Sequence, residues 1–159
     1  MTERSNQTIP YARQSISDAD IEAVVKVLRS DYLTQGPVVP EFENTVADYC
    51  QAKHAVAVNS GTSALHIACL ALGLGPQDWL WTTAITFVAS ANCARYCGAR
   101  VDFVDIDPHT YNLSSESLER KLKTAKQEGR LPKVVVAVHL CGQPCDMERI
   151  HLLSEQYGF

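Results

Sequence analysis

The stretch that most constrains the fold of this chain runs from His54 to Gly75, HAVAVNSGTSALHIACLALGLG. It opens with four apolar residues, 55–58, turns at Asn59-Ser60-Gly61, and continues as a segment rich in Ala and Leu. This order predicts a strand, a tight turn and a helix. The helix would present one apolar face, formed by Leu65, Ala68, Cys69 and Leu72.

The turn itself has the properties of an anion site. A helix that begins there leaves backbone N–H groups unpaired, and the hydroxyls of Thr62 and Ser63 flank them. Unpaired donors and the positive end of the helix dipole both favour a phosphate group. An ordinary capped turn between a strand and a helix explains the same residues equally well. The local pattern therefore leaves two interpretations open, a phosphate site and a plain turn.

Composition and charge narrow the possible partners. The 159 residues suit one domain, and 46% apolar with 20% charged residues is typical of globular proteins. A net charge of −4 without a basic tract makes nucleic acid or an anionic membrane surface an unfavourable partner. The sequence lacks both a long apolar run and the apolar core of a signal peptide near its start, MTERSNQTIP. We therefore expect a cytoplasmic protein without a membrane span.

Six cysteines raise the question of disulfides or a metal. In a reducing compartment they are expected to be free thiols that pack as small apolar groups. Two C-x3-C pairs would suit a metal on a helix, with His139 close to the second pair. Pro144 favours a loop there, and the tight C-x2-C spacing of zinc knuckles is missing, so we expect no metal site. The six are Cys50, Cys69, Cys93, Cys97, Cys141 and Cys145.

Two helices are predicted before the central stretch. Ser17 and Asp20 form a variant of the capping box, and the helix that follows runs to about Ser30. A loop over 31–37, punctuated by Gly-Pro, separates it from a second helix with Pro40 in its first turn. The second helix would bury the side of the chain formed by Phe42, Val46 and Tyr49.

After the central stretch, strand and helix patterns alternate. Strands are predicted over 79–83, 101–106 and 133–140, and helices over 87–96, from Ser114 or Ser115 past Leu122, and from Asp146 to Tyr157. Thr82, Thr83 and Thr86 are able to cap the first of these helices. The continuous β-branched run at 133–140 is expected of a strand covered on both faces. The alternation predicts an α/β fold, a mostly parallel sheet with helices on both faces.

Ligands of such sheets bind at the carboxyl ends of the strands, and two further polar turns would lie there beside Ser60–Ser63. In Thr82–Asn92, Phe87 follows a polar turn, where its ring either stacks on a flat ligand or packs as a core residue. The residue alone favours the core. In His139–Asp146, the residues alone indicate a hydrogen-bonded histidine at a strand end rather than a catalytic one.

Taken together, the chain resembles the DegT/DnrJ/EryC1/StrS family of pyridoxal-phosphate sugar aminotransferases. The resemblance rests on SGTSALHIACLALGLGPQD, TTAITFVASANCARYCGARVDFVDIDPHTYNL, VVVAVHLCGQPCDM and, near the start, IPYARQSISDADIEAVVKVLRSDYLTQGP. It covers nearly all of residues 8–159. It implies part of the large domain of a fold-type-I pyridoxal-phosphate enzyme over 1–159, with a helical segment over 1–50 and β/α units over 51–159.

The resemblance also implies a cofactor, pyridoxal 5′-phosphate, and roles for particular residues. Thr62 and Ser63 would hold the cofactor phosphate, and Phe87 would stack on the pyridine ring. The nucleotide-sugar would contact Tyr11, Asp31, Tyr32, Leu33, Thr34 and Gly61. The implied reaction moves an amino group from glutamate to C4 of a UDP-4-keto-6-deoxy-N-acetylhexosamine, in biosynthesis of the pseudaminic acid type. The whole enzyme would be a homodimer.

The catalytic groups of the family are expected beyond Phe159. These are the lysine that binds the cofactor and the Asp that pairs with its pyridine nitrogen, so no residue of this chain is assigned as catalytic. The chain's own candidate lysines flank strands or lie on a polar helix face, where solvation is the simplest role: Lys53, Lys121, Lys123, Lys126 and Lys133. We therefore expect an N-terminal piece of a longer enzyme, inactive by itself.

Three other functions stay open. A sugar 3-dehydratase of the same family would carry histidine in place of the lysine. A non-catalytic phosphate- or nucleotide-binding module would use only Thr62 and Ser63. A cysteine-based metal protein is the third. In the resembled fold the strand at 54–59 lies apart from those near Trp81, Phe103 and Val136, so exposed strand edges are expected. Trp79 and Trp81 depart from the family's usual residues.

Overall fold

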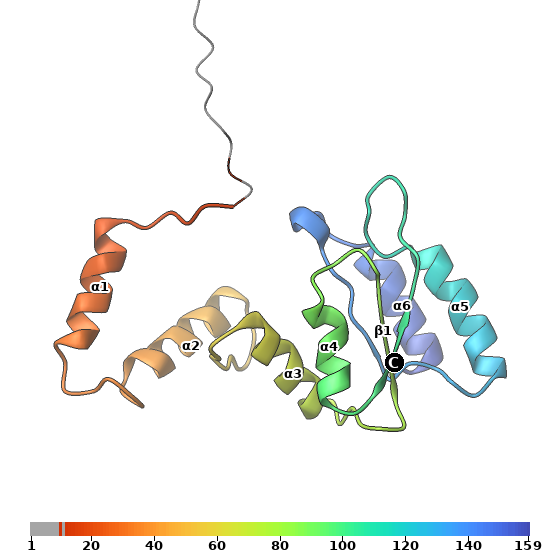
Figure 1. The fold of residues 1–159 in the computed structure, drawn as a ribbon, viewed down its shortest axis with the longest axis horizontal. Helices are drawn as coiled ribbons and strands as arrows, with labels where there is room; N and C mark the ends of the chain where they lie inside the picture. Colours follow the sequence, from red (N-terminus) through yellow and green to blue (C-terminus); the bar gives the residue numbers. More distant parts are fainter. Residues whose placement is uncertain (1–9, 11) are drawn as a thin grey trace, which may run out of the picture. The chain divides into compact units, whose positions relative to one another are not determined.

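The structure is a computed structural model that describes residue 10 and residues 12–159. The chain divides into two compact units, one that ends at Ala57 and one that spans Val58–Phe159. The first contains helices α1 and α2, and the second contains the parallel sheet and its helices (Figure 1). None of the helices in the described part of the chain has both the length and the apolar character needed to span a bilayer.

Helix α1, Asp18–Leu28, begins where the sequence predicts. The Ser17 hydroxyl accepts the N–H of Asp20 at 3.3 Å, and the Asp20 carboxylate accepts the N–H of Ser17 at 2.7 Å. This reciprocal pair confirms the capping box, because each side chain satisfies a donor that the helix leaves unpaired. The apolar face of α1 nevertheless lies in solvent, with Val24 59% and Leu28 64% exposed.

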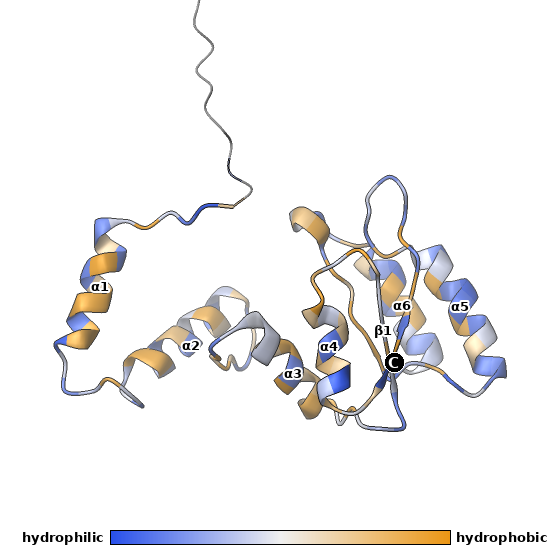
Figure 2. Cartoon of the chain, viewed as in Figure 1, coloured by the Kyte–Doolittle hydropathy of each residue, from blue (hydrophilic) through white to orange (hydrophobic). Residues whose placement is uncertain are grey.

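Helix α2, Val38–Tyr49, places Pro40 in its first turn as predicted, but its predicted buried side is wrong. Phe42 is 58% and Tyr49 90% exposed, whereas Ala47 is buried. Figure 2 shows strongly hydrophobic residues along both α1 and α2. The physical reason is size, since two helices and an extended segment provide too little apolar surface to cover one another.

The second unit is built on a three-stranded parallel sheet. Strands β1, Trp79–Thr82, β2, Arg100–Phe103, and β3, Val134–Val135, lie in the order β2-β1-β3. Leu80 in the central strand is in register with Val101 on one side and Val134 on the other. The parallel pairing and the helices between the strands confirm the predicted α/β class.

Helices α3, Gly61–Ala71, and α4, Ala89–Tyr96, pack on one face of this sheet. Their core contains Cys69 from α3, Cys93 and Ala94 from α4 and Leu80 from β1, and Leu80 and Cys93 are both 0% exposed. Cys69 and Leu65 are thus on the inner side of α3, as predicted. Leu72 and Ala68, predicted to lie on the same face, are exposed.

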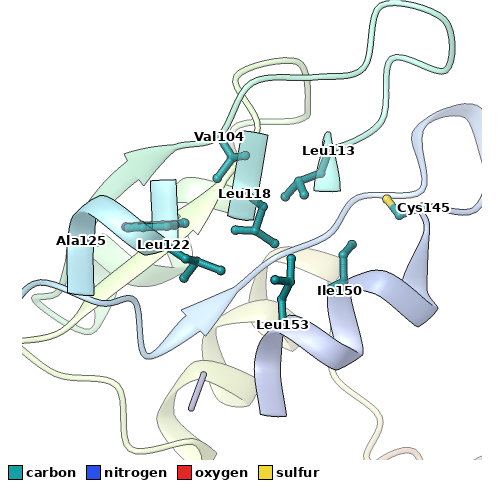
Figure 3. Packing of buried hydrophobic residues seen from close by; sticks show 9 residues of the cluster. Val104, Leu113, Leu118, Leu122, Ala125, Cys145, Ile150 and Leu153 are labelled. Atoms are coloured by element: carbon teal, nitrogen blue, oxygen red, sulfur yellow. The ribbon is translucent and has the colours of Figure 1, made fainter. Parts of the chain in front are cut away.

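Helices α5, Ser115–Gln127, and α6, Met147–Tyr157, cover the opposite face. Leu118 and Leu122 from α5 and Leu153 from α6 are 0% exposed and meet over Trp81 of β1. In Figure 3 the side chains of α5 and α6 point toward one another across this core. Helix α6 begins at its predicted cap, Asp146, and α5 at Ser114, one of the two caps predicted for it. The side-chain oxygens of both residues accept N–H groups of the first turn.

The two tryptophans of β1 face α5 and α6 and lie beside cationic side chains. The Lys121 ammonium is 4.9 Å from the centre of the Trp81 ring and forms an ion pair with Asp102 at 2.7 Å. The Arg100 guanidinium is 5.5 Å from the centre of the Trp79 ring. Such cation–π contacts and the burial of Trp81 give both residues a structural role.

Three predicted elements differ in the structure. Residues 54–58 form no strand, and in the described part of the chain they pair with neither β2 nor β3, whose outer edges therefore stay open. Helix α4 begins at Ala89 rather than Phe87, and the threonines do not cap it. The hydroxyls of Thr82 and Thr83 donate to the carbonyls of Val136 and Ile85. That of Thr86 shares a hydrogen bond of 3.1 Å with the Ser90 hydroxyl in the first turn of α4, not with a backbone N–H. Strand β3 is shorter than the run at 133–140, since ladder pairing to β1 ends at Val135.

Candidate functional site

The N-terminus of α3 is the best-defined polar turn of the second unit. Ser60 has an extended backbone, with φ −162°, and its hydroxyl accepts the N–H of Ser63 at 3.2 Å. The Ser63 hydroxyl in turn donates to the Asn59 side-chain oxygen at 2.7 Å. The turn is therefore a capped helix start. Asn59 takes part in the cap by accepting this hydrogen bond, a role that the sequence pattern did not predict.

Three features of this turn suit an anion. The N–H groups of Gly61 and Thr62 precede the first helical hydrogen bond, so they are free to face a ligand. A Cβ added at Gly61 would meet nothing within 4 Å, which means that the space around it is open. The first turn of α3 contains no acidic residue, so the positive end of its dipole is not neutralised. A phosphate group fits this arrangement.

Phe87 lies at the carboxyl side of β1, between the strand and α4. Its side chain is 74% exposed, and Ile85 and Val88 beside it are 45% and 58% exposed. The interpretation of Phe87 as a core residue is therefore wrong, since the chain turns its ring outward before α4 begins. A solvent-exposed apolar cluster at the end of a parallel strand is typical of a binding surface.

His139 follows β3 and is held by a backbone hydrogen bond. Its Nδ1 accepts the N–H of Cys145 at 3.1 Å, which confirms the hydrogen-bonded histidine that the sequence predicts at this strand end. The Cys145 thiol donates to the carbonyl of Val138 at 3.2 Å, and burial raises the pKa of that thiol. Cys145 is thus a structural thiol rather than a reactive one.

Asn112 holds the same loop and was missed by sequence reasoning. It is 3% exposed, its side-chain oxygen accepts the N–H of Leu140 at 3.0 Å, and its side-chain nitrogen donates to the carbonyls of Gln143 and Pro144. A single Asn in a connection between a strand and a helix has no sequence pattern that marks such long-range bonds. Only the fold brings it against a loop about thirty residues away.

The predicted sugar-binding residues belong to different parts of the structure. Tyr11 lies outside the described residues. Asp31–Thr34 form an exposed loop of the first unit, where the Tyr32 N–H donates to the Ser30 hydroxyl at 3.3 Å. An open cavity of about 560 Å³ in that unit is lined by Tyr32 together with residues of α1 and α2. Gly61 belongs to the turn of the second unit.

All six cysteines carry free thiols, in three kinds of environment: three are buried, two are exposed, and Cys97 is of intermediate exposure. Cys69, Cys93 and Cys145 are buried, and burial with the neighbouring Cys93 raises the pKa of Cys69 to about 12. Cys50 and Cys141 are exposed, so the expectation that every thiol packs as an apolar group is wrong for these two. Within the described residues, no group of three His, Cys, Asp or Glu side chains is arranged to hold a metal ion.

Two curated proteins show what the chain is similar to. It is 39% identical over 158 residues to the spore coat polysaccharide biosynthesis protein SpsC of Bacillus subtilis, which covers 99% of this chain and 39% of that protein. It is 45% identical over 123 residues to the GDP-perosamine synthase of Caulobacter vibrioides, which covers 77% of this chain and 32% of that protein. The chain therefore spans well under half the length of these relatives.

Solved structures agree with this similarity. The PLP form of Spr1654 from Streptococcus pneumoniae, described as a sugar aminotransferase, superposes with a TM-score of 0.83 at 31% identity. The match covers 94% of this chain and 37% of that one, which confirms part of a fold-type-I aminotransferase fold. A family model for the DegT/DnrJ/EryC1/StrS aminotransferases matches residues 14–159. The chain belongs to the DegT/DnrJ/EryC1/StrS aminotransferase family.

Proposed function

We propose that this chain contributes the phosphate-binding part of a pyridoxal-phosphate-dependent sugar-nucleotide aminotransferase. The observation that carries the proposal is the N-terminus of α3, which is open at Gly61 and has no acidic residue in its first turn. Thr62 and Ser63 would hold the phosphate of pyridoxal 5′-phosphate, and the exposed ring of Phe87 would stack on the pyridine. The bound cofactor would supply an electron sink for amino transfer.

In this proposal, the residues of this chain bind and orient the phosphate of the cofactor. The N–H groups of Gly61 and Thr62 would neutralise phosphate charge without a counter-ion, because the helix dipole points the same way. The bond from Ser63 to Asn59 fixes the hydroxyl at the helix start before any ligand arrives. Such preorganisation lowers the entropic cost of binding.

The proposed substrate is a UDP-4-keto-6-deoxy-N-acetylhexosamine, with glutamate as the amino donor. The product would be UDP-4-amino-4,6-dideoxy-N-acetyl-β-L-altrosamine, in biosynthesis of the pseudaminic acid type. The proposal is supported by the sequence segments that resemble the transaminase forming this product. Tyr11, Asp31–Thr34 and Gly61 would contact the nucleotide-sugar. One relative is named for a GDP-linked sugar, so a competition experiment between UDP and GDP is needed to identify the nucleotide that this chain prefers.

The whole enzyme is proposed to be a cytoplasmic homodimer. The 159-residue chain alone is proposed to bind ligands without turnover, because none of its lysines is placed as a covalent partner. Lys133 donates to the carbonyl of Gly73 at 2.6 Å and contacts Asp78 at 3.1 Å, so its amine is engaged. Borohydride treatment with pyridoxal 5′-phosphate should leave the mass of the chain unchanged. A stoichiometric lysine adduct would contradict this.

A phosphate- or nucleotide-binding module without catalysis is the second candidate. It is favoured by the local nature of the turn, whose side-chain hydrogen bonds join only residues 59, 60 and 63 and need no distant partner. A sugar 3-dehydratase of the same family shares the turn and differs in a residue outside this chain. If the chain binds UDP but not pyridoxal 5′-phosphate, the module is favoured over the two enzymes.

The proposal is tested by titrating the chain with pyridoxal 5′-phosphate and following binding by calorimetry. Thr62→Val and Ser63→Ala should each weaken binding about tenfold, the loss expected for one hydrogen bond to a charged group. Ser154→Ala is a matched control, because the Ser154 hydroxyl donates within α6 to the carbonyl of His151. Equal affinity in all four proteins would refute the assignment of the turn.

A further inference from the structure

Asn112 uses every hydrogen-bonding group of its side-chain amide to hold the loop His139–Cys145. Its nitrogen donates at 2.8 Å to the carbonyl of Gln143 and at 3.1 Å to that of Pro144, and its oxygen accepts the N–H of Leu140 at 3.0 Å. Two donors and one acceptor on one planar group fit no other residue of this size. The amide is 3% exposed, so water cannot replace these bonds.

The loop needs such support because its backbone is not a relaxed one. Cys141 has φ +53° and Gly142 has φ +83°, both in the left-handed region, which is unfavourable for a non-glycine residue such as Cys141. Leu140–Gly142 form only a single short turn. The bonds from Asn112 enclose this turn on both sides, at Leu140 and at Gln143 and Pro144.

The fixed loop determines which nitrogen of His139 carries the proton. The Cys145 N–H points at Nδ1 from 3.1 Å, so Nδ1 is an acceptor and the neutral ring carries its proton on Nε2. His139 is exposed, so this Nε2–H is available to an acceptor on a ligand. The residue follows β3, as Thr83–Phe87 follow β1, at the carboxyl edge where parallel sheets bind ligands.

We propose that Asn112 is a positioning residue, which holds the His139–Cys145 loop so that His139 presents its Nε2–H to a phosphate oxygen of the ligand. The ligand part of this inference rests on the proposed function, whereas the positioning part does not. The oxygen belongs either to pyridoxal 5′-phosphate or to the diphosphate of the nucleotide-sugar. The two sources share one chemistry, and separate titrations with pyridoxal 5′-phosphate and UDP distinguish them.

The positioning part is tested on the chain alone by the ¹⁵N resonances of the His139 ring at pH 8. The wild-type ring should show one tautomer, protonated at Nε2. Asn112→Leu should give a mixture of tautomers and at least tenfold faster hydrogen exchange at the Cys145 amide. Asn112→Ser, which admits water in place of the amide, provides a milder variant should the first not fold. Gln156→Leu, an exposed change on α6, should change neither signal.

An unchanged tautomer in a folded Asn112 variant overturns the positioning part. For the ligand part, Asn112→Ser and His139→Phe should each weaken binding of one probe about tenfold. His139→Gln should restore part of it, because its amide nitrogen lies near the position of Nε2. If wild type binds a probe and these variants bind it with the same affinity, the ligand part is overturned and the proposed function stays intact. Failure of wild type to bind either probe overturns both, and the tautomer measurement still decides the role of Asn112.

Discussion

The ammonium group of Lys133 donates to the backbone carbonyl of Gly73 at 2.6 Å, across sixty residues of chain. Gly73 has φ +68° and lies just beyond the C-cap of α3, so the bond gives a partner to a backbone carbonyl in the segment that leaves the helix. The same ammonium contacts Asp78 at 3.1 Å, which in turn accepts the N–H of Gly75. One lysine at the start of β3 therefore ties down the segment that leads from α3 into β1.

We expect Lys133→Met to lower the free energy of unfolding by about 1 kcal/mol, the value of one hydrogen bond from a charged donor near the surface. The effect should depend on pH. The Lys133 ammonium and the Gly75 N–H lower the pKa of Asp78 from its ordinary value of 3.8. A lowered pKa stabilises the fold above pH 3.8, and this contribution is lost as the pH falls through the lower value in the folded state.

Urea unfolding of wild type and Lys133→Met between pH 2 and pH 7 checks both expectations. The difference between the two proteins should be largest near neutral pH and should shrink in acid. Lys26→Met serves as the control, because Lys26 is exposed on α1, in the other unit of the chain. A difference that stays constant with pH would show that Asp78 plays no part.

Gly61→Asp should stabilise the fold and abolish phosphate binding at the same time. The position has room for a side chain, and a carboxylate in the first turn of α3 interacts favourably with the helix dipole, by about 0.3–1 kcal/mol. The same negative charge would repel a phosphate at that helix start. Thermal unfolding and a titration with pyridoxal 5′-phosphate measure the two effects, and Gly61→Ala controls for the loss of glycine. Retained affinity in Gly61→Asp would place the phosphate elsewhere.

Phe87→Ala should leave stability nearly unchanged while weakening the binding of pyridoxal 5′-phosphate. The ring is 74% exposed, and surface substitutions typically change the free energy of unfolding by less than about 0.5 kcal/mol. Loss of a stacking partner should cost about 1 kcal/mol of binding, or roughly fivefold in Kd. Val88→Ala, at a 58% exposed neighbour, is the matched control. A strongly destabilised Phe87→Ala protein would mean that the ring packs against the core after all.

Leu118→Ala should destabilise the second unit by about 2–5 kcal/mol, since a fully buried leucine is replaced and a cavity remains. Leu152→Ala on α6 removes the same atoms from a 53% exposed position and should cost far less. Denaturant midpoints of the two variants make the comparison. Similar midpoints would indicate that the α5–α6 layer is not a packed core in solution.

Local sequence patterns predicted most of the elements of this protein. Capping signals at Ser17, Ser114 and Asp146 predicted where helices begin, because a cap depends only on residues three positions away. The alternation of strand and helix patterns predicted the parallel sheet, because short crossovers allow few other arrangements. The hydroxyls of Thr62 and Ser63 at a predicted helix start marked the candidate phosphate turn for the same local reason.

Partners distant in sequence decided the rest. Residues 54–58 have the composition of a strand but no strand beside them. Phe87 has the apolar ring of a typical core residue, but its side chain is exposed. The hydroxyl of Thr82 bonds to Val136 rather than to a helix start, and Asn112 reaches a loop on the next β/α unit. A sequence pattern records what a residue is able to bond or bury. Which neighbour it meets depends on how the sheet and its helices assemble, and only the tertiary structure contains that information.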